Sequence, residues 1–159
     1  SNATSYIPTL SGAGATRAAD TGVQTGDISS FIDSESFEIE LSLKDLGDYT
    51  ERRRFTVSDG GSSNRLRISK ETNGSVVVVF DIAGASSSVA FSKSSTPSSD
   101  FVLEVLSKSG NYKAYIDGVE FGSSSSTTVF AAGVLKYIKL SEVNGTIPFY
   151  SNIKQIKIS

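Results

Sequence analysis

Cysteine, histidine and tryptophan are all absent from this sequence of 159 residues. Without cysteine the chain has no disulfide framework, no thiolate nucleophile and no cysteine-ligated metal. Without histidine it lacks the commonest general base and transition-metal ligand, which excludes serine–histidine and cysteine–histidine catalysis. Without tryptophan it also lacks the strongest side chain for stacking on a sugar ring. Acid–base chemistry is therefore left to aspartate, glutamate, lysine and tyrosine.

Strong charge of one sign and long hydrophobic runs are missing as well. The formal net charge is -2, far from the basic balance of a nucleic-acid-binding protein. No apolar run is long enough to cross a bilayer and there is no signal peptide, so we expect neither a nucleic-acid partner nor membrane insertion. Ser1-Asn2-Ala3 resembles the remnant of a cleaved expression tag. Residues 4–159 suffice for one domain with a sizeable core, and nothing marks a domain boundary.

Helical periodicity is almost absent, and the short apolar runs are punctuated by serine, glycine, asparagine and aspartate. This pattern indicates an all-β sandwich or barrel. The most informative stretch is Asp100–Gly122, where two apolar runs are joined by Ser109-Gly110-Asn111 and a second reversal follows at Asp117-Gly118. Asp-Gly between apolar runs is a strong hairpin signal. The stretch therefore predicts a three-stranded antiparallel meander.

The rest of the chain predicts further strands, roughly a dozen in all, which suits two packed antiparallel sheets. Phe37–Leu43 alternates most cleanly, with its apolar residues on one face and Glu38, Glu40 and Ser42 on the other. Asn73-Gly74 predicts a hairpin turn. A helix candidate lies near Leu43 to Tyr49, weakened by Gly47. The other predicted strands cover residues 28–32, 53–58, 64–69, 75–82, 87–93, 135–141 and 152–158.

Several stretches carry a resemblance to a known family. Residues 5–9 (SYIPT), 15–20 (ATRAAD) and 26–31 (GDISSF) resemble the start of concanavalin A-like, or laminin-G-like, jelly-roll domains of phage tail fibres and prophage structural proteins. Residues 112–122 (YKAYIDGVEFG) and 153–158 (IKQIKI) are similar to the hairpin and closing strand of that fold. The resemblance implies a two-sheet jelly-roll sandwich with a concave face that is non-catalytic, lies in a virion tail or at a cell surface, and often binds surface glycans.

Glu38 and Glu40 lie two apart on one strand face, as the acid and nucleophile of a glycosidase would. The laminarinase-type hydrolases that share the fold carry three acids at alternate positions, but here the third position is Ser42. A solvated ladder explains the glutamates more simply. If the strands near residues 37, 52 and 64 pair as successive hairpins, these carboxylates lie beside Arg52, Arg54, Arg65 and Arg67. We therefore expect no enzyme.

Two kinds of side chain are candidates for ligand binding. Arg52 and Arg54 could bind an anionic glycan or a lipopolysaccharide phosphate, because arginine binds such groups bidentately; the charge ladder is the alternative. Tyrosines could stack on sugar rings, and we consider Tyr112, Tyr115, Tyr137 and Tyr150. Tyr115 is the best candidate, because it shares a face with Lys113 and Asp117, whereas Ala114 and Ile116 point the other way; a half-buried strand tyrosine is the alternative.

No cofactor is expected, although calcium remains a candidate. Oxygen donors stand at strand ends, at Asp59, Asn64, Asp81, Asp117 and Asn144, and loops from separate strands can assemble the ligands that calcium needs. Their simpler explanation is turn geometry. The Asn-Gly-Ser at residues 73–75 and the Asn-Gly-Thr at residues 144–146 also match the glycosylation acceptor pattern, but Asn-Gly is the preferred hairpin turn.

The sequence thus predicts a non-catalytic binding or structural domain that recognises a host surface glycan beside other structural protein domains. A ligand-free spacer is one alternative, and a carbohydrate-binding module or adhesin of a bacterial extracellular protein is another. A glycoside hydrolase is the least favoured of the alternatives.

Overall fold

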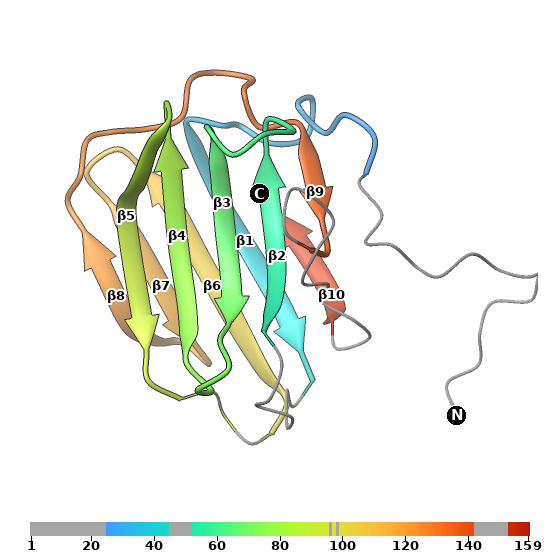
Figure 1. The fold of residues 1–159 in the computed structure, drawn as a ribbon, viewed down its shortest axis with the longest axis vertical. Helices are drawn as coiled ribbons and strands as arrows, with labels where there is room; N and C mark the ends of the chain where they lie inside the picture. Colours follow the sequence, from blue (N-terminus) through green and yellow to red (C-terminus); the bar gives the residue numbers. More distant parts are fainter. Residues whose placement is uncertain (1–24, 45–51, 96, 98, 142–152) are drawn as a thin grey trace, which may run out of the picture.

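The protein folds as two five-stranded antiparallel sheets packed face to face in this computed structural model, which describes residues 25–44, 52–95, 97, 99–141 and 153–159 (Figure 1). The front sheet has the strand order β5-β4-β3-β2-β9, and the back sheet has the order β10-β1-β6-β7-β8. The strands are β1 (Ser36–Leu43), β2 (Arg53–Ser58), β3 (Arg65–Lys70), β4 (Val76–Ile82), β5 (Ala85–Lys93), β6 (Phe101–Lys108), β7 (Tyr112–Ile116), β8 (Val119–Ser124), β9 (Tyr137–Lys139) and β10 (Ile153–Ile158).

Each sheet contains one run of consecutive hairpins. Strands β2 to β5 form the front run, and β6 to β8 form the predicted meander at one side of the back sheet. The remaining strands are long-range additions: β9 pairs with β2, while β1 joins β6 to β10. The chain therefore changes sheet four times, between β1 and β2, between β5 and β6, between β8 and β9, and between β9 and β10.

The core lies between the sheets and follows from period-two alternation along the strands. In β1 the buried side chains are Phe37, Ile39, Leu41 and Leu43, whereas the residues between them face outward. Full burial of such a side chain contributes about 1.5–3 kcal/mol. Aromatic rings connect the two layers. Phe80 of the front sheet packs edge to face against Tyr112 of the back sheet, with 4.9 Å between the ring centroids.

The Asp117-Gly118 turn confirms the hairpin prediction. Both residues have positive φ, 50° and 74°, which a type I′ turn requires. The Asp117 carboxylate also accepts a hydrogen bond of 2.8 Å from the Val102 backbone N–H. The Asn73-Gly74 turn is confirmed too, since Gly74 has φ 80° and its N–H donates to the carbonyl of Glu71.

Gly122 allows β5 and β8 to meet at the edge of the sandwich. A Cβ at this position would lie 2.4 Å from Cγ of Phe91, far inside ordinary van der Waals contact. The missing side chain therefore lets Phe91 pack over the strand and cover the core on that side.

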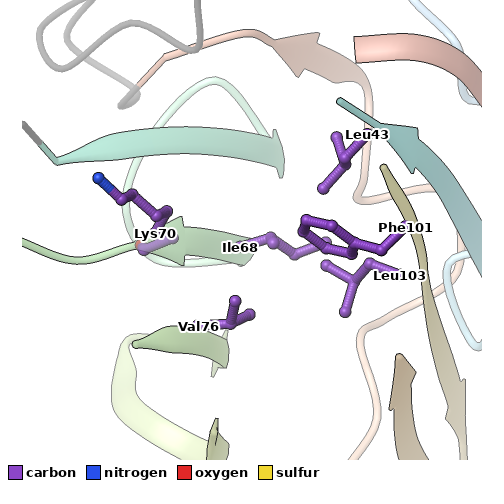
Figure 2. A pocket seen from close by; sticks show the side chains of 7 residues that line it. Leu43, Ile68, Lys70, Val76, Phe101 and Leu103 are labelled. Atoms are coloured by element: carbon purple, nitrogen blue, oxygen red, sulfur yellow. The ribbon is translucent and has the colours of Figure 1, made fainter. Parts of the chain in front are cut away.

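A small apolar cavity of about 10 Å³ lies at one end of the sandwich, between strands of both sheets (Figure 2). Ile68, Phe101 and Leu103 point into it, whereas the amine of Lys70 is directed away from it. Lys70 is almost fully buried, so its aliphatic stem extends the apolar inner face of β3.

Two predicted elements differ from the structure. Residues 28–32 form a turn and not a strand, because the N–H groups of Phe31 and Ile32 both donate to the Ile28 carbonyl. The helix candidate is wrong at its first residue, since Leu43 ends β1; residues 45–49 lie outside the described part. In that part the strands number ten, and it holds no helix long and apolar enough to cross a membrane.

Candidate ligand-binding face

The structure divides the predicted site residues between two opposite sides of the molecule. Lys113 and Tyr115 point outward from β7 on the outer face of the back sheet, here called the back face. Arg52, Arg54 and Tyr137 belong to β2, its preceding residue and β9, on the outer face of the front sheet, here called the front face. These residues therefore do not form one site.

On the back face Lys113 and Lys157 each lie beside a carboxylate, and Lys108 is exposed on the same face. Lys113 lies 3.5 Å from Glu120, and Lys157 lies 2.6 Å from Glu40. A hydrogen bond to the Tyr115 side chain, then the charges of Tyr115 and Glu120, raise the pKa of Lys113. Tyr115 is half-buried among these groups. The back face thus has no excess of cations for an anionic ligand.

The predicted charge ladder is wrong, because β1 and β2 lie in different sheets. Glu40 pairs with Lys157 on the back face, and Glu38 exchanges backbone hydrogen bonds with Ser159. The arginines lie on the front face, on the other side of the core. Glu38 and Glu40 therefore neither neutralise these arginines nor share a site with them.

The front face is built from rows of side chains that the strand register fixes. One row runs from Tyr137 through Ser58 and Arg65 to Asp81. The adjacent row runs through Lys139, Thr56, Arg67 and Val79 to Ala90.

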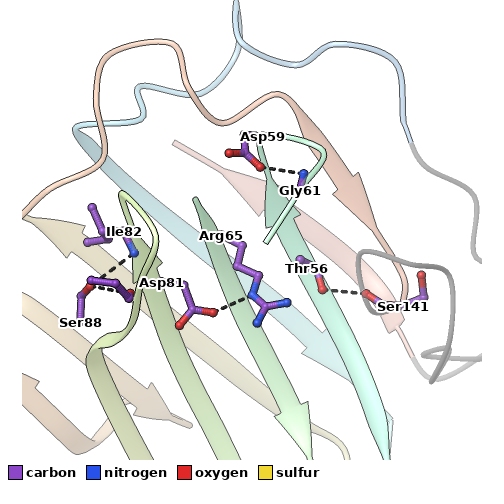
Figure 3. Close-up of polar contacts among 9 residues, drawn as sticks. Thr56, Asp59, Gly61, Arg65, Asp81, Ile82, Ser88 and Ser141 are labelled. Carbon is purple, nitrogen blue, oxygen red and sulfur yellow. Dashed lines mark hydrogen bonds and ion pairs between the residues drawn. The ribbon is translucent and has the colours of Figure 1, made fainter. Parts of the chain in front are cut away.

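The Arg65–Asp81 pair is the most buried ion pair measured on this face. Arg65 Nε donates to Asp81 Oδ2 at 2.6 Å, and the two side chains are only 16% and 3% exposed. Figure 3 shows the two groups reaching toward each other from neighbouring strands β3 and β4. A charge-assisted hydrogen bond in a partly dry setting is strong and directional. The pair therefore fixes both side chains in place.

The loops beside this pair are tied together by Asn64. Its amide nitrogen donates to Asp59 Oδ2 at 3.0 Å, and its Oδ1 accepts from the Ala83 N–H at 2.9 Å. Asp59 Oδ1 in turn accepts from the Gly61 N–H at 2.7 Å (Figure 3). The turn after β2 and the turn after β4 are thus joined into one rim at this end of the front face.

Tyr137 stands at the opposite end of the row from Asp81. A Cβ on Gly60 would lie 3.2 Å from Tyr137 Cε2, so the tyrosine ring packs directly against the backbone of that turn. Strand β9 is short, but Ile138 exchanges two hydrogen bonds with Thr25 on its far side, at 3.0 and 2.9 Å. The ring is therefore held by its surroundings while remaining partly exposed.

The front face is more open over β5 than over β2. Thr56 and Ser58 are fully buried, and the Thr56 hydroxyl donates to the Ser141 carbonyl at 2.7 Å (Figure 3). Ala90 and Ser92 of β5 are exposed. Among the described strands, the front face is therefore most exposed over β5.

Positive charge is concentrated on the front face. Arg52 pairs with Glu71 at 2.5 Å, and Arg65 pairs with Asp81. Burial first, and then the charge of Arg65, lowers the pKa of Arg67. Burial and then the charge of Arg67 lowers the pKa of Arg54 in the same way. The face therefore holds like charges close enough to repel one another.

The remaining candidates have structural roles in the described part of the chain. Tyr112 is fully buried and its hydroxyl donates to the Thr128 carbonyl, so the interpretation of this tyrosine as a stacking residue is wrong. The oxygen atoms of Asp59, Asn64, Asp81 and Asp117 bind neighbouring protein groups. Within the described residues no group of three or more acids could hold a metal. Asn144 and Tyr150 lie outside them.

The sequence correctly placed Arg65 and Arg67 on one face with Arg52 and Arg54. It listed Asp81 among possible calcium ligands and so missed that Asp81 shares this face and pairs with Arg65. Alternation with Leu66 and Ile68 showed which way both arginines point. The signal that was missing is the exact register of β3 and β4, which sets Arg65 opposite Asp81.

Comparison with solved structures identifies the fold. A galectin of Caenorhabditis elegans, LEC-6, superposes with a TM-score of 0.56 at 14% identity, covering 87% of this chain and 91% of the galectin. The CBM40 domain of the Ruminococcus gnavus IT-sialidase, bound to α2,3-sialyllactose, gives a TM-score of 0.64 at 15% identity, covering 86% and 84%. This chain has the concanavalin A-like jelly-roll fold.

The NanB sialidase of Streptococcus pneumoniae gives a TM-score of 0.63 at 18% identity, covering 86% of this chain but only 26% of the sialidase. The jelly roll therefore corresponds to a minor part of that enzyme. No protein-family model matches the sequence, and neither does any curated protein sequence.

Proposed function

We propose that this domain is a non-catalytic, lectin-like module that binds glycans on its front face. The observation that carries the proposal is the row that ends in the Arg65–Asp81 pair, with Tyr137 at its other end. These groups stand on paired strands beside a hydrogen-bonded rim. Binding groups held by a rigid scaffold lose little freedom when a ligand arrives.

Each member of the row suits a sugar. An arginine offers several N–H donors in a fixed plane, which suits the hydroxyl groups of a sugar, and the pair with Asp81 holds the Arg65 guanidinium on this face. The Tyr137 ring offers an apolar surface with a polar tip, which suits the alternating C–H and O–H groups of a pyranose. A flat sheet face buries little of a ligand, so affinity per site is low and is raised by multivalent display.

The structural neighbours support a glycan as ligand. The Ruminococcus gnavus CBM40 domain was solved bound to sialyllactose. A botulinum neurotoxin type C structure, described as interacting with two ganglioside molecules, matches 78% of this chain at a TM-score of 0.57. Such likeness concerns the fold, and this chain's own residues must supply the binding.

The setting follows the sequence resemblance. We propose a domain of a phage tail or prophage structural protein, joined to other structural domains and adsorbing to a host surface glycan. A bacterial extracellular protein would use the same face in the same way. Calcium dependence is tested directly by repeating the binding measurement with EDTA.

The decisive experiment uses two tyrosines on opposite faces. Tyr137→Ala and Tyr115→Ala remove the same side chain from the front and back faces, and both proteins are tested on a panel of bacterial surface and host-type glycans. We expect selective binding by the wild type, lost in Tyr137→Ala and kept in Tyr115→Ala.

The opposite pattern would move the site to the back face and refute the proposal. An absence of binding at millimolar glycan, with an unchanged circular dichroism spectrum, would identify a ligand-free spacer.

A further inference from the structure

We infer that the front face selects glycans that carry an anionic group, a carboxylate or a phosphate, and that Arg67 is the residue that binds it. This inference rests on the proposed function and names the ligand class of the same face. It follows from where Arg67 stands, from what its neighbours do, and from the geometry of a guanidinium group.

Arg67 occupies the middle of the front face. Strand β3 is the third of five strands in that sheet, and Arg67 is its third residue of six. Its partners in the register are Thr56 on one side and Val79 on the other, neither of which carries charge. A ligand lying across the middle of this sheet therefore passes over this guanidinium.

The two front-face carboxylates of the described residues are directed at other arginines. Asp81 accepts from Arg65 at 2.6 Å, and Glu71 lies 2.5 Å from Arg52. Within the described part of the chain, the side chain of Arg67 makes no hydrogen bond or ion pair. The face thus retains a half-buried cation at its centre after its own acids are matched.

The electrostatics at Arg67 favour an anion. Its pKa is lowered by burial and then by the neighbouring charge of Arg65, and the carboxylates of Asp81 and Glu71 offset only part of that shift. A carboxylate or phosphate placed against Arg67 would offset both the lost hydration and the repulsion. Two parallel N–H···O bonds to such a group also match the planar fork, which a lysine cannot reproduce.

Paired probes test the inference, because each pair differs in its anionic group. We would titrate the purified domain with lactose and sialyllactose, with methyl-esterified and free polygalacturonate, and with mannose and mannose 6-phosphate. We expect the charged member of at least one pair to bind about tenfold more tightly or better. That preference should shrink as the NaCl concentration rises from about 50 to 500 mM. The carboxylate pairs and the phosphate pair separate the two sources of charge.

Two variants with the same change in net charge form the matched comparison. Arg67→Ala should abolish the preference for the charged member. Lys157→Ala, on the back face, should leave it intact. Arg67→Lys keeps the charge but loses the fork, so it should restore the preference only in part. Urea unfolding curves for all three variants establish that each is folded.

Failure of this inference is distinguishable from failure of the glycan-binding proposal. Equal binding of both members of every pair, abolished by Tyr137→Ala, would overturn the anionic preference and leave glycan binding on the front face. Preference that survives Arg67→Ala but disappears in Lys157→Ala would place the anion on the back face. Binding of no probe and of no glycan on the wider panel would overturn both.

Discussion

Arg65→Ala is the perturbation for which the structure gives the clearest magnitude. The substitution removes the guanidinium whose Nε lies 2.6 Å from Asp81 Oδ2 and leaves behind a carboxylate that is only 3% exposed. Breaking a buried ion pair by deleting one partner typically costs about 3–5 kcal/mol, because the remaining charge is then poorly compensated. Arg65 itself is 16% exposed, so solvent screens part of the interaction. We therefore expect the lower end, about 3 kcal/mol of unfolding free energy.

The back face supplies a control for this number. The Lys157–Glu40 pair has nearly the same length, 2.6 Å, but its side chains are 55% and 24% exposed. Exposed pairs of this kind contribute about 0–1 kcal/mol. Lys157→Ala should therefore reduce the unfolding free energy by less than about 1 kcal/mol. In a domain of this size 1 kcal/mol corresponds to about 2–4 °C in Tm, so Arg65→Ala should lose about 6–12 °C.

Urea unfolding followed by far-ultraviolet circular dichroism is the suitable assay, because the chain has no tryptophan to report by fluorescence. A double-mutant cycle then separates the lost attraction from the stranded charge. Adding Asp81→Ala to Arg65→Ala should recover stability, since the buried carboxylate is removed. Two results would refute this reasoning. One is a loss of unfolding free energy in Arg65→Ala no larger than the loss in Lys157→Ala. The other is a loss in the double variant equal to the sum of the losses in Arg65→Ala and Asp81→Ala.

Two further predictions concern packing and titration. Gly122→Ala should destabilise the fold by about 1–3 kcal/mol, because the new Cβ would lie 2.4 Å from Phe91 Cγ. Gly26→Ala is the control: its new Cβ meets no atom within 4 Å, so the urea concentration at its unfolding midpoint should equal that of the wild type. Burial raises the pKa of Tyr112, so the unfolded chain releases this proton first and stability should fall as the pH rises above about 10. Tyr112→Phe removes the hydrogen bond to Thr128, so its unfolding free energy at neutral pH should be about 1 kcal/mol lower. The variant should also lose less stability than the wild type as the pH rises above about 10. An unchanged dependence of stability on pH would contradict this assignment.

Local features of the fold could be predicted from the sequence because they depend on neighbouring residues. The strand predicted over residues 53–58 has those bounds in the structure, since Phe55 and Val57 alternate with polar side chains. The Asp117-Gly118 turn followed from two residues that tolerate positive φ. Such signals are complete within a few positions of the chain, so no knowledge of the rest of the fold is needed.

The pairing of the strands could not be predicted in the same way. Phe37–Leu43 was expected beside residues 53–58, but β1 pairs with β6 and β10, whose partner residues lie more than 50 positions away in the sequence. The preference for consecutive hairpins is a tendency and not a rule. Residues 28–32 failed for a different reason: their buried Ile32 reaches the core from a turn, which apolar residues alone do not distinguish from a strand.

The same limit explains the candidate site. Alternation showed correctly that Tyr115 and Lys113 share a face, and that Arg65 and Arg67 point away from Leu66. It could not show that the first pair and the second lie on opposite sides of the core. Alternation along a strand shows which side chains point away from the core. Only the long-range pairing of the strands shows which sheet, and so which side of the molecule, a strand belongs to.

A net charge of -2 conceals a division of charge between the two faces. The back face carries Glu38, Glu40, Glu104 and Glu120 with Lys108, Lys113 and Lys157, whereas the front face carries Arg52, Arg54, Arg65, Arg67 and Lys139 with Glu71 and Asp81. Local potential, and not the total, attracts a charged ligand. Arg65 stabilises the fold through its ion pair with Asp81. Arg67 places a second positive charge beside it, and burial together with the charge of Arg65 disfavours the charged form of Arg67. An anion bound at Arg67 supplies a physical reason for that arrangement, and a ligand-free spacer supplies none.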